Sequence, residues 1–227
     1  MIIILKKLEW DSNFWNENIY EINIEEIEEN IQINLEEKSY LIQAKVDIDK
    51  IKQINILEKL GFYFKDLEVE YEKNIDEYFY EKIEKIENLK LNDIENLIEP
   101  LIKNSRFDIF DEKKILEFYE TWVKNAIKGI YDDECFFIKE NSEIAGLISY
   151  KKNNDFYARI GLLSIWDKYQ RKNLGTYLLR SIESYLYKNG IKKLSICTQG
   201  KNKIANNFYI KNGYKIKNTK VIMYLKK

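Results

Sequence analysis

The chain has 227 residues, of which 45% are hydrophobic and 33% are charged, and its formal net charge is −1. This is enough apolar material for one large core or two small ones, and the lack of a basic surplus argues against a nucleic-acid partner. The sequence contains no histidine. Catalysis by Ser-His-Asp or Cys-His groups and the usual histidine-containing zinc sites are therefore excluded, and we expect no metal.

The sequence also predicts the compartment. The first residues, MIIILKK, place charge after a short apolar run, which is the reverse of a secretory signal. No run approaches the ~18 apolar residues of a membrane-spanning helix, so no membrane partner is expected. Cys135 and Cys197 lie far apart in apolar runs and are interpreted as two buried thiols. We expect a cytoplasmic protein.

Residues 1–75 predict a small α/β domain. A strand is expected at 2–5, and residues 40–73 have the pattern of a strand, a helix and a strand. The Glu-rich, strand-poor residues 74–91 are the expected join to a second domain, 76–227.

The end of the first domain resembles the end of the chain. Aligning Gly61 with Gly213 gives an offset of 213 − 61 = 152, which places Val46 on Thr198. A unit of strand, helix, glycine and strand is common in proteins. A degenerate half-repeat and a chance likeness therefore both stay open.

Two helices are predicted to open the second domain. Asn92 is a candidate N-cap for the first, in which Pro100 predicts a kink or break near Glu99. A polar stretch at 104–106 precedes the second helix. The apolar face of this second helix is expected to comprise Leu116, Tyr119, Trp122, Val123 and Ala126.

The remaining elements predict a mixed α/β sheet with the element order ααβββαβαββ. Three strand-like runs separated by short polar turns indicate an antiparallel meander, at 135–139, 144–150 and 156–165. The later elements are a helix over 174–188, a strand over 193–198, a helix over 203–211 and a closing strand pair over 214–225. Asn-Gly pairs at 189–190 and 212–213 are typical helix ends.

The first candidate site lies at 165–176, where a strand leads into a helix. The first N–H groups of a helix have no partner inside it and its dipole attracts anions, which suits a pyrophosphate. Gly175 allows close approach of the backbone to a ligand, and Arg171 and Lys172 could add charge. Taken alone, a basic turn before a helix is more often solvated surface.

The second candidate site lies at 202–209. Ala205 is small enough for close helix packing, and Tyr209 follows one turn later on the same face. Taken alone, Asn202 is most simply a helix cap, and Tyr209 is most simply a core residue with a satisfied hydroxyl.

Together the two segments resemble the paired motifs of the GCN5-related N-acetyltransferases (GNAT superfamily) over about residues 80–227. The motifs are Gln170-x-x-Asn173-x-Gly175, and Asn202-x-x-Ala205-x-x-x-Tyr209 followed by Gly213-Tyr214. The resemblance implies a GNAT fold, a mixed and mostly antiparallel sheet flanked by helices, and acetyl-CoA as co-substrate. Asn173 stands where the family usually has its first glycine, and Asn tolerates a positive φ better than most residues.

The resemblance also implies a mechanism. Acetyl-CoA would lie in a wedge between the strand ending at Ile165 and the strand at 193–198. An uncharged amine would attack the thioester directly in a ternary complex, and Tyr209 would protonate the departing thiolate. The residues implied to bind the cofactor are Leu163, Ser164, Ile165, Gln170, Arg171, Lys172, Asn173, Leu174, Gly175, Thr176, Asn202 and Phe208.

The whole chain further resembles the dTDP-fucosamine acetyltransferase group, which acetylates the amino group of a dTDP-linked 4-amino-4,6-dideoxyhexose. The matching stretches are Leu8-Glu9-Trp10-Asp11-Ser12-x-Phe14, Leu60-Gly61-Phe62, Ser105-Arg106-Phe107, Phe118-Tyr119-x-x-Trp122-x-x-Asn125-Ala126, Thr198-Gln199-x-x-Asn202 and Tyr224-Leu225. The comparison points to Glu68 as general base and Arg106 as an acceptor contact. The simpler interpretation of Glu68 is an exposed residue of the charged run 66–72.

Two alternatives remain at this stage. A GNAT enzyme acting on a protein N-terminus, a lysine or a small amine would keep both cofactor segments. A non-catalytic CoA-binding or regulatory module is the other alternative, left open by Asn173 and by the possible degenerate first domain. A homodimer through an exposed edge strand is also left open.

Overall fold

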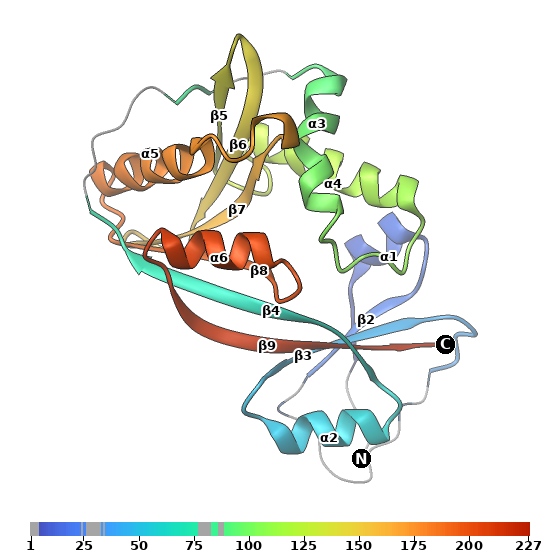
Figure 1. Ribbon diagram of the computed structural model, residues 1–227. Coiled ribbons are helices and arrows are strands. Elements are labelled where there is room, and N and C mark those ends of the chain that lie inside the picture. Colours follow the sequence, from blue (N-terminus) through green and yellow to red (C-terminus); the bar gives the residue numbers. More distant parts are fainter. Residues whose placement is uncertain (1–4, 24, 26–32, 34, 77–82, 86–88) are drawn as a thin grey trace. The chain divides into compact units, whose positions relative to one another are not determined.

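The computed structural model describes residues 5–23, 25, 33, 35–76, 83–85 and 89–227. They form two compact units. Unit 1 comprises Met1–Val69, Gln199–Lys201 and Asn218–Lys227, and unit 2 comprises Glu70–Thr198 and Asn202–Lys217. The strands β4 (Tyr63–Asn74) and β9 (Lys215–Lys226) contribute residues to both units (Figure 1). The division at residue 75 stays a prediction, and all but Leu5 of the strand expected at 2–5 lies outside the described residues.

Unit 1 is built on a sheet with the strand order β1-β2-β3-β9-β4. Its other elements are β1 (Leu5–Lys7), α1 (Glu9–Trp15), β2 (Ile19–Ile22), β3 (Leu41–Asp47) and α2 (Ile51–Lys59). β2 and β3 are parallel, and β3 and β9 are antiparallel. Alternate residues of β3, Ile42, Ala44 and Val46, are fully buried in a core that includes Leu57 of α2. The predicted strand, helix and strand of 40–73 are therefore confirmed, whereas α1 and β2 were not predicted.

The two β-α-β segments have the same bounds at an offset of 152. β3, α2 and β4 correspond residue for residue to β8 (Lys193–Gln199), α6 (Lys203–Lys211) and β9. Gly61 and Gly213, between helix and strand, both have positive φ, +93° and +85°. The likeness in sequence is thus accompanied by a likeness in local structure, and a common origin of the two segments stays a prediction.

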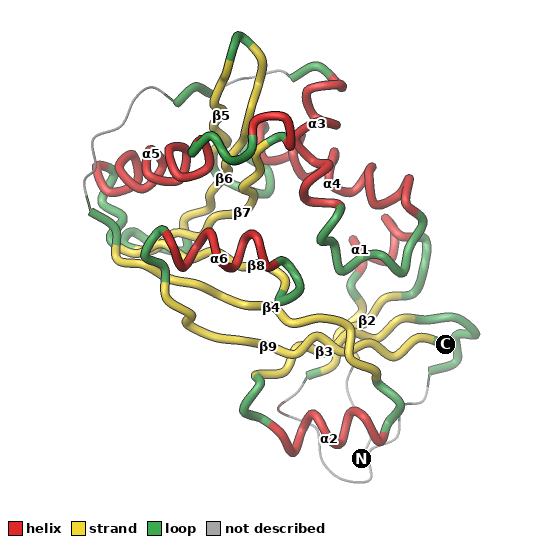
Figure 2. The backbone as a smooth tube through the Cα atoms, in the orientation of Figure 1, coloured by secondary structure: helices red, strands yellow, loops and turns green. Residues whose placement is uncertain are grey.

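Unit 2 has the strand order β4-β8-β7-β6-β5 (Figures 1 and 2). The predicted meander is confirmed, because β5 pairs antiparallel with β6 and β6 with β7. α5 packs against these three strands, and α3 and α4 pack on their other face. The elements are α3 (Leu91–Ile102), α4 (Glu112–Ile127), β5 (Glu134–Glu140), β6 (Glu143–Lys152), β7 (Tyr157–Ile165) and α5 (Leu174–Lys188), with β8 and α6 as above.

Three details differ from the prediction. α3 begins at Leu91, so Asn92 lies inside the helix, and the helix continues through Pro100 to Ile102. Proline has no N–H, so the helix continues past Pro100 with one backbone hydrogen bond fewer. The segment 215–226 contains no glycine or proline to turn the chain, so it forms the single strand β9 instead of a strand pair. The buried face of α4 is Ile115, Phe118, Tyr119, Val123 and Ala126, which leaves Leu116 and Trp122 half-buried.

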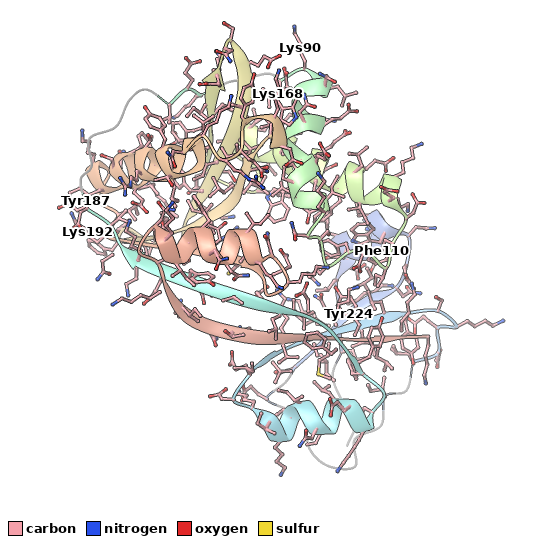
Figure 3. The ribbon with its side chains drawn as sticks, in the orientation of Figure 1. Lys90, Phe110, Lys168, Tyr187, Lys192 and Tyr224 are labelled. Atoms are coloured by element: carbon pink, nitrogen blue, oxygen red, sulfur yellow. The ribbon has the colours of Figure 1, made fainter. Side chains whose placement is uncertain are left out.

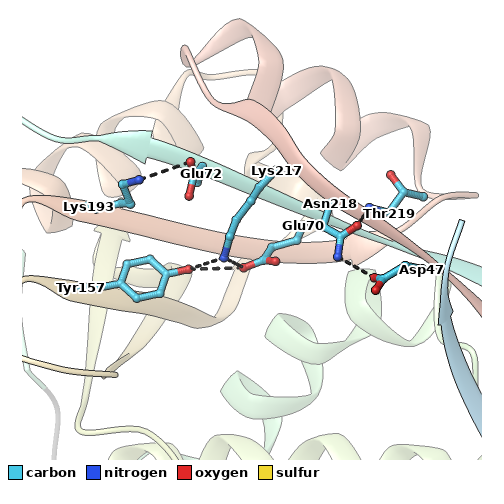
Figure 4. A network of polar contacts seen from close by, with 8 residues as sticks. All are labelled: Asp47, Glu70, Glu72, Tyr157, Lys193, Lys217, Asn218 and Thr219. Carbon is cyan, nitrogen blue, oxygen red and sulfur yellow. Dashed lines mark hydrogen bonds and ion pairs between the residues drawn. The ribbon is translucent and has the colours of Figure 1, made fainter. Parts of the chain in front are cut away.

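Charged side chains connect the strands of unit 2 (Figure 4). Lys217 on β9 lies 2.8 Å from the carboxylate of Glu70 on β4, and the Tyr157 hydroxyl lies 3.3 Å from the same oxygen. Lys193 on β8 lies 3.4 Å from Glu72. These half-exposed pairs add modestly to cross-strand pairing. Among the helices of the described residues, none is long and apolar enough to cross a membrane.

Candidate active site

The strands β7 and β8 diverge partway along their length. They pair in parallel over 157–160 and 193–196, although β7 continues to Ile165 and β8 to Gln199. β7 stays paired with β6 as far as Ile165. The edge of residues 161–165 that faces away from β6 is therefore open to another hydrogen-bonding partner. This divergence is the wedge that the GNAT resemblance predicts.

A buried polar group fixes β7 at the start of the wedge. The pairing of β6 and β7 changes register at residue 149. Here Ser149 accepts a hydrogen bond from the Leu162 N–H (2.9 Å) and donates one to the buried carboxylate of Asp132 (2.6 Å). A Cβ on Gly161 would lie 2.2 Å from a carboxylate oxygen of Asp132, so only glycine leaves room for this arrangement.

The turn from β7 into α5 is shaped for an anion. Arg171 and Asn173 have φ of +62° and +61°. Asn173 thus adopts the conformation for which glycine is the usual choice. Among the described residues, no acceptor is found for the N–H groups of residues 171–176. Left-handed residues direct successive N–H groups to one side, and the start of α5 adds its dipole, which together favour a phosphate group.

The side chains of the turn support its shape. Gln170 donates from Nε2 to the Ile165 carbonyl (3.1 Å) and to the Asp167 carboxylate (2.6 Å), which closes the loop. Lys168, labelled in Figure 3, belongs to the short 3₁₀-helix Asp167–Tyr169. Its Nζ lies 2.6 Å from a carboxylate oxygen of Glu143. The buried Tyr169 donates its hydroxyl proton to the same carboxylate.

A cavity of about 390 Å³ lies against this turn. All of the predicted cofactor residues except Lys172 line it, and Lys172 instead lies over the Tyr169 ring, 5.0 Å from its centroid. The lining residues that the sequence did not single out for this role are Pro100, Leu101, Asn104, Tyr169, Ile204, Ala205 and Lys211. Among the described residues, no group of three or more Cys, Asp or Glu side chains is arranged to hold a metal ion.

The helix α6 brings Tyr209 to the cavity. Asn202 caps this helix by accepting from the Ala205 N–H (3.1 Å), as its position in the sequence suggested. Tyr209 is 5% exposed and lines the cavity. Burial, and then the nearby Cys197 and Tyr71, raise the pKa of Tyr209 above the ordinary value for tyrosine. The phenol is therefore neutral, and able to donate a proton, at any physiological pH.

The two cysteines have different environments. Cys135 on β5 is buried, as predicted, but Cys197 on β8 is exposed. The prediction of two buried thiols is thus wrong for Cys197.

Glu68 and Arg106 lie outside the cavity lining. Glu68 belongs to unit 1, where its half-exposed carboxylate forms a 2.8 Å ion pair with Lys45. Arg106 lies in the loop between α3 and α4, with its guanidinium 4.5 Å from the centroid of the Phe107 ring. The same loop contributes Asn104 to the cavity.

Comparison with known families identifies this arrangement. The acetyltransferase (GNAT) family matches residues 99–214, which span the wedge, the turn and α6 and make up a little over half of the chain. The chain belongs to the GNAT family. It is an acetyl-CoA-dependent N-acetyltransferase.

Individual GNAT relatives agree with this assignment. The chain is 25% identical over 186 residues to a dTDP-fucosamine acetyltransferase from Escherichia coli O6:H1, covering 81% of this chain and 80% of that protein. A GCN5-related N-acetyltransferase from Sphaerobacter thermophilus has a TM-score of 0.57 at 12% identity, covering 83% of this chain and 60% of the other. A GNAT acetyltransferase from Colwellia psychrerythraea has a TM-score of 0.53 at 11% identity, and the match covers 80% of this chain and 64% of the other. At such identities the two structures show the fold alone, and both are longer than this chain.

Proposed function

We propose that this GNAT enzyme transfers the acetyl group of acetyl-CoA to the amino group of a nucleotide-linked amino sugar of the dTDP-4-amino-4,6-dideoxyhexose type. Support for the acceptor comes from the relative named dTDP-fucosamine acetyltransferase, which aligns with 81% of the chain. The observation that carries the cofactor assignment is the cavity that joins the open edge of β7, the free N–H groups of 171–176 and Tyr209.

Acetyl-CoA would extend along this cavity. Backbone groups of Leu163, Ser164 and Ile165 on the open edge of β7 would pair with the pantetheine arm as with an added strand. The N–H groups of residues 171–176 would hold the pyrophosphate, and Arg171 would add charge at its side. The thioester would then lie toward Tyr209, at the narrow end of the wedge.

Transfer would proceed by direct attack. The lone pair of the uncharged sugar amine forms the new C–N bond at the thioester carbonyl, and the C–S bond then breaks. Tyr209 gives its proton to the departing thiolate, and the nitrogen loses one proton to a base. Since burial keeps Tyr209 protonated, it suits the role of general acid, which contributes roughly 10²–10⁴-fold in rate.

Glu68 and Arg106 complete the proposal on the acceptor side. The chain has no histidine, so the proton of the incoming ammonium must go to a carboxylate or to water. We assign this proton-accepting role to Glu68. The guanidinium of Arg106 would bind the diphosphate of the acceptor. Glu68→Gln should lower kcat with an unchanged acetyl-CoA dissociation constant. Lys45→Met, which removes the ion-pair partner of Glu68, is the matched control for loss of the pair alone.

The experiment that tests the function is release of the CoA thiol from acetyl-CoA. The acceptors compared are a dTDP-4-amino-4,6-dideoxyhexose, a panel of peptides and simple amines. Fast release with the nucleotide sugar alone is expected. Release only with peptides or amines would overturn the acceptor assignment and leave the enzyme class intact.

Tyr209→Phe separates catalysis from binding in the same assay. The variant should lose about 10²-fold in kcat and bind acetyl-CoA as the parent does, because only the proton donor is removed. An unchanged kcat would overturn the role of Tyr209. If no acceptor supports turnover while acetyl-CoA still binds, the chain is a CoA-binding module.

A further inference from the structure

The charged side chains that line the cavity are all of one sign. Among the described residues, Arg171 and Lys211 are the charged members of the lining, and no carboxylate belongs to it, although the chain contains 38 Asp and Glu residues. Neither cation lies within ion-pair distance of a carboxylate of the described residues. Two unpaired cations without an acid favour a ligand that carries negative charge at two places.

Lys211 lies at the outer edge of the helix face that lines the cavity. At about 100° per residue along α6, Phe208 lies between Tyr209 and Lys211 around the helix. All three line the cavity. Tyr209 is buried, Phe208 is half-buried and Lys211 is exposed. The cavity therefore extends around α6 from a buried end at Tyr209 to an open rim at Lys211.

The anion-binding turn meets the middle of this face. The Phe208 ring packs on Gly175 at the start of α5. Lys211 follows Phe208 by three residues, so the two side chains are neighbours on the helix surface. The turn at 171–176 is thus flanked by Tyr209 on the buried side and by Lys211 on the open side.

Coenzyme A carries a second anionic group beside its diphosphate. The 3′-phosphate and the 5′-diphosphate are attached to the same ribose, so the two groups lie close together. The ribose follows the diphosphate at the end remote from the thioester. With the thioester toward Tyr209 and the diphosphate at the turn, the 3′-phosphate lies toward the open rim.

We propose that Lys211 binds the 3′-phosphate of coenzyme A, so that the enzyme selects acetyl-CoA over its 3′-dephospho form. The inference rests on the proposed placement of the cofactor. The Lys211 ammonium has three N–H donors and can reach a phosphate oxygen from the rim while it stays hydrated. An ion pair at such an exposed place has a modest strength that salt screens.

The test is calorimetric titration of the full-length protein with acetyl-CoA and, separately, with 3′-dephospho-acetyl-CoA. We expect the parent to bind acetyl-CoA about fivefold more tightly, which is the scale of an exposed ion pair. Lys211→Met keeps the aliphatic stem and should abolish this preference by weakening the binding of acetyl-CoA alone. Lys211→Arg should retain the preference. Raising the salt concentration from about 0.05 M to 0.5 M should reduce it in the parent.

Lys203→Met is the matched control. Lys203 is an exposed lysine of the same helix and is not among the residues that line the cavity. Its replacement changes the net charge by the same amount as Lys211→Met. Both dissociation constants should stay as in the parent. An equal loss of acetyl-CoA affinity in the two variants would show that net charge sets the preference, and would overturn a contact at Lys211.

Three further outcomes would overturn the inference. Equal affinity of the parent for the two ligands would show that the 3′-phosphate is not recognised. A preference that persists in Lys211→Met would assign its recognition to another group. Equal weakening of both ligands by Lys211→Met would show that the residue supports the shape of the cavity. In each case acetyl-CoA still binds to the parent, and the inference alone is wrong. If neither ligand binds to the parent, the cofactor assignment of the cavity is wrong as well.

Discussion

The ring of Phe208 occupies the space into which a side chain at position 175 would extend. A Cβ on Gly175 would meet the Cε2 and Cζ atoms of Phe208 at 3.3 and 3.4 Å. The first turn of α5 therefore packs directly against α6. The sequence pattern suggested that Gly175 allows a ligand to approach the backbone, and the structure adds a second reason, which is helix packing.

Gly175→Ala should weaken acetyl-CoA binding and leave the fold intact. The added methyl group requires the Phe208 ring to move by a few tenths of an ångström, an overpacking penalty of about 1 kcal/mol. If this penalty is incurred in the acetyl-CoA-bound state, the dissociation constant for acetyl-CoA should rise about fivefold. Calorimetry measures this constant. Gly175→Ala/Phe208→Leu, with a smaller partner, should recover part of the affinity. A dissociation constant equal to that of the parent would contradict the packing argument.

The elements of unit 2 were predictable because their patterns are long. The helix expected over 174–188 has the bounds of α5, and the one over 203–211 has those of α6, since both combine apolar periodicity with Asn-Gly ends. α1 was missed because its seven residues, Glu9–Trp15, are too short for periodicity and lack a side-chain cap. Short helices of this kind depend on tertiary packing more than on their own sequence.

The site was predictable only where its residues are close in sequence. The turn at 170–176 and the start of α6 carry recognisable motifs, but Pro100, Leu101 and Asn104 come from α3 and the residues after it. Apolar periodicity identifies α3 as a helix and contains no information on which cavity its end will line.

Tyr71 should be a positioning residue for Tyr209. Its hydroxyl donates to the Asn206 side chain (2.8 Å), whose amide donates to the Asn202 carbonyl (2.8 Å) at the start of α6. The Tyr71 and Tyr209 rings are 5.6 Å apart. Tyr71→Phe removes one hydrogen bond worth about 1 kcal/mol and keeps the ring. We expect a severalfold lower kcat with little change in the KM for acetyl-CoA.

Tyr214→Phe is the matched control for this prediction. The ring centroid of Tyr214 also lies near that of Tyr209, at 6.1 Å. The Tyr214 hydroxyl, however, donates to the carboxylate of Glu183 on α5. The control should lose at least as much stability in urea unfolding and retain kcat. An equal loss of kcat in both variants would indicate a general loss of stability, with no positioning role for Tyr71.

The pH dependence of acetyl transfer should lack a falling alkaline limb. Burial raises the pKa of Tyr209 above its ordinary value of 10.0, so the phenol keeps its proton to higher pH than an exposed tyrosine. The rate should therefore rise as the acceptor amine loses its proton and then level off. The measurement is kcat from about pH 6 to pH 10, at saturating substrates. A fall in kcat within this range that Tyr209→Phe abolishes would show that the phenol ionises there.

The buried pair of Lys73 and Glu183 should give unit 2 a pH-dependent stability. Lys73 Nζ lies 2.8 Å from one carboxylate oxygen of Glu183, whose side chain is fully buried on α5, and Tyr214 donates to the other oxygen at 2.8 Å. Lys73→Met removes this cation, and Arg180 is then the other positive charge that lowers the pKa of Glu183. We expect a loss of about 3–5 kcal/mol in the free energy of unfolding at pH 7, measured in urea.

The sign of the pH dependence follows from the pKa of Glu183, which burial raises above its ordinary value of 4.5 despite the opposing influence of Lys73, Tyr214 and Arg180. The folded state then holds this proton more tightly than the unfolded state. The contribution of Glu183 to stability is complete below pH 4.5 and is lost as the pH rises through its pKa in the folded state. The deficit of Lys73→Met should accordingly shrink as the pH falls, because a protonated Glu183 needs no cation. Glu183→Gln, which cannot ionise, should remove this part of the pH dependence. A deficit of Lys73→Met that is the same at low and neutral pH would show that the lysine stabilises the fold through packing and not through its charge.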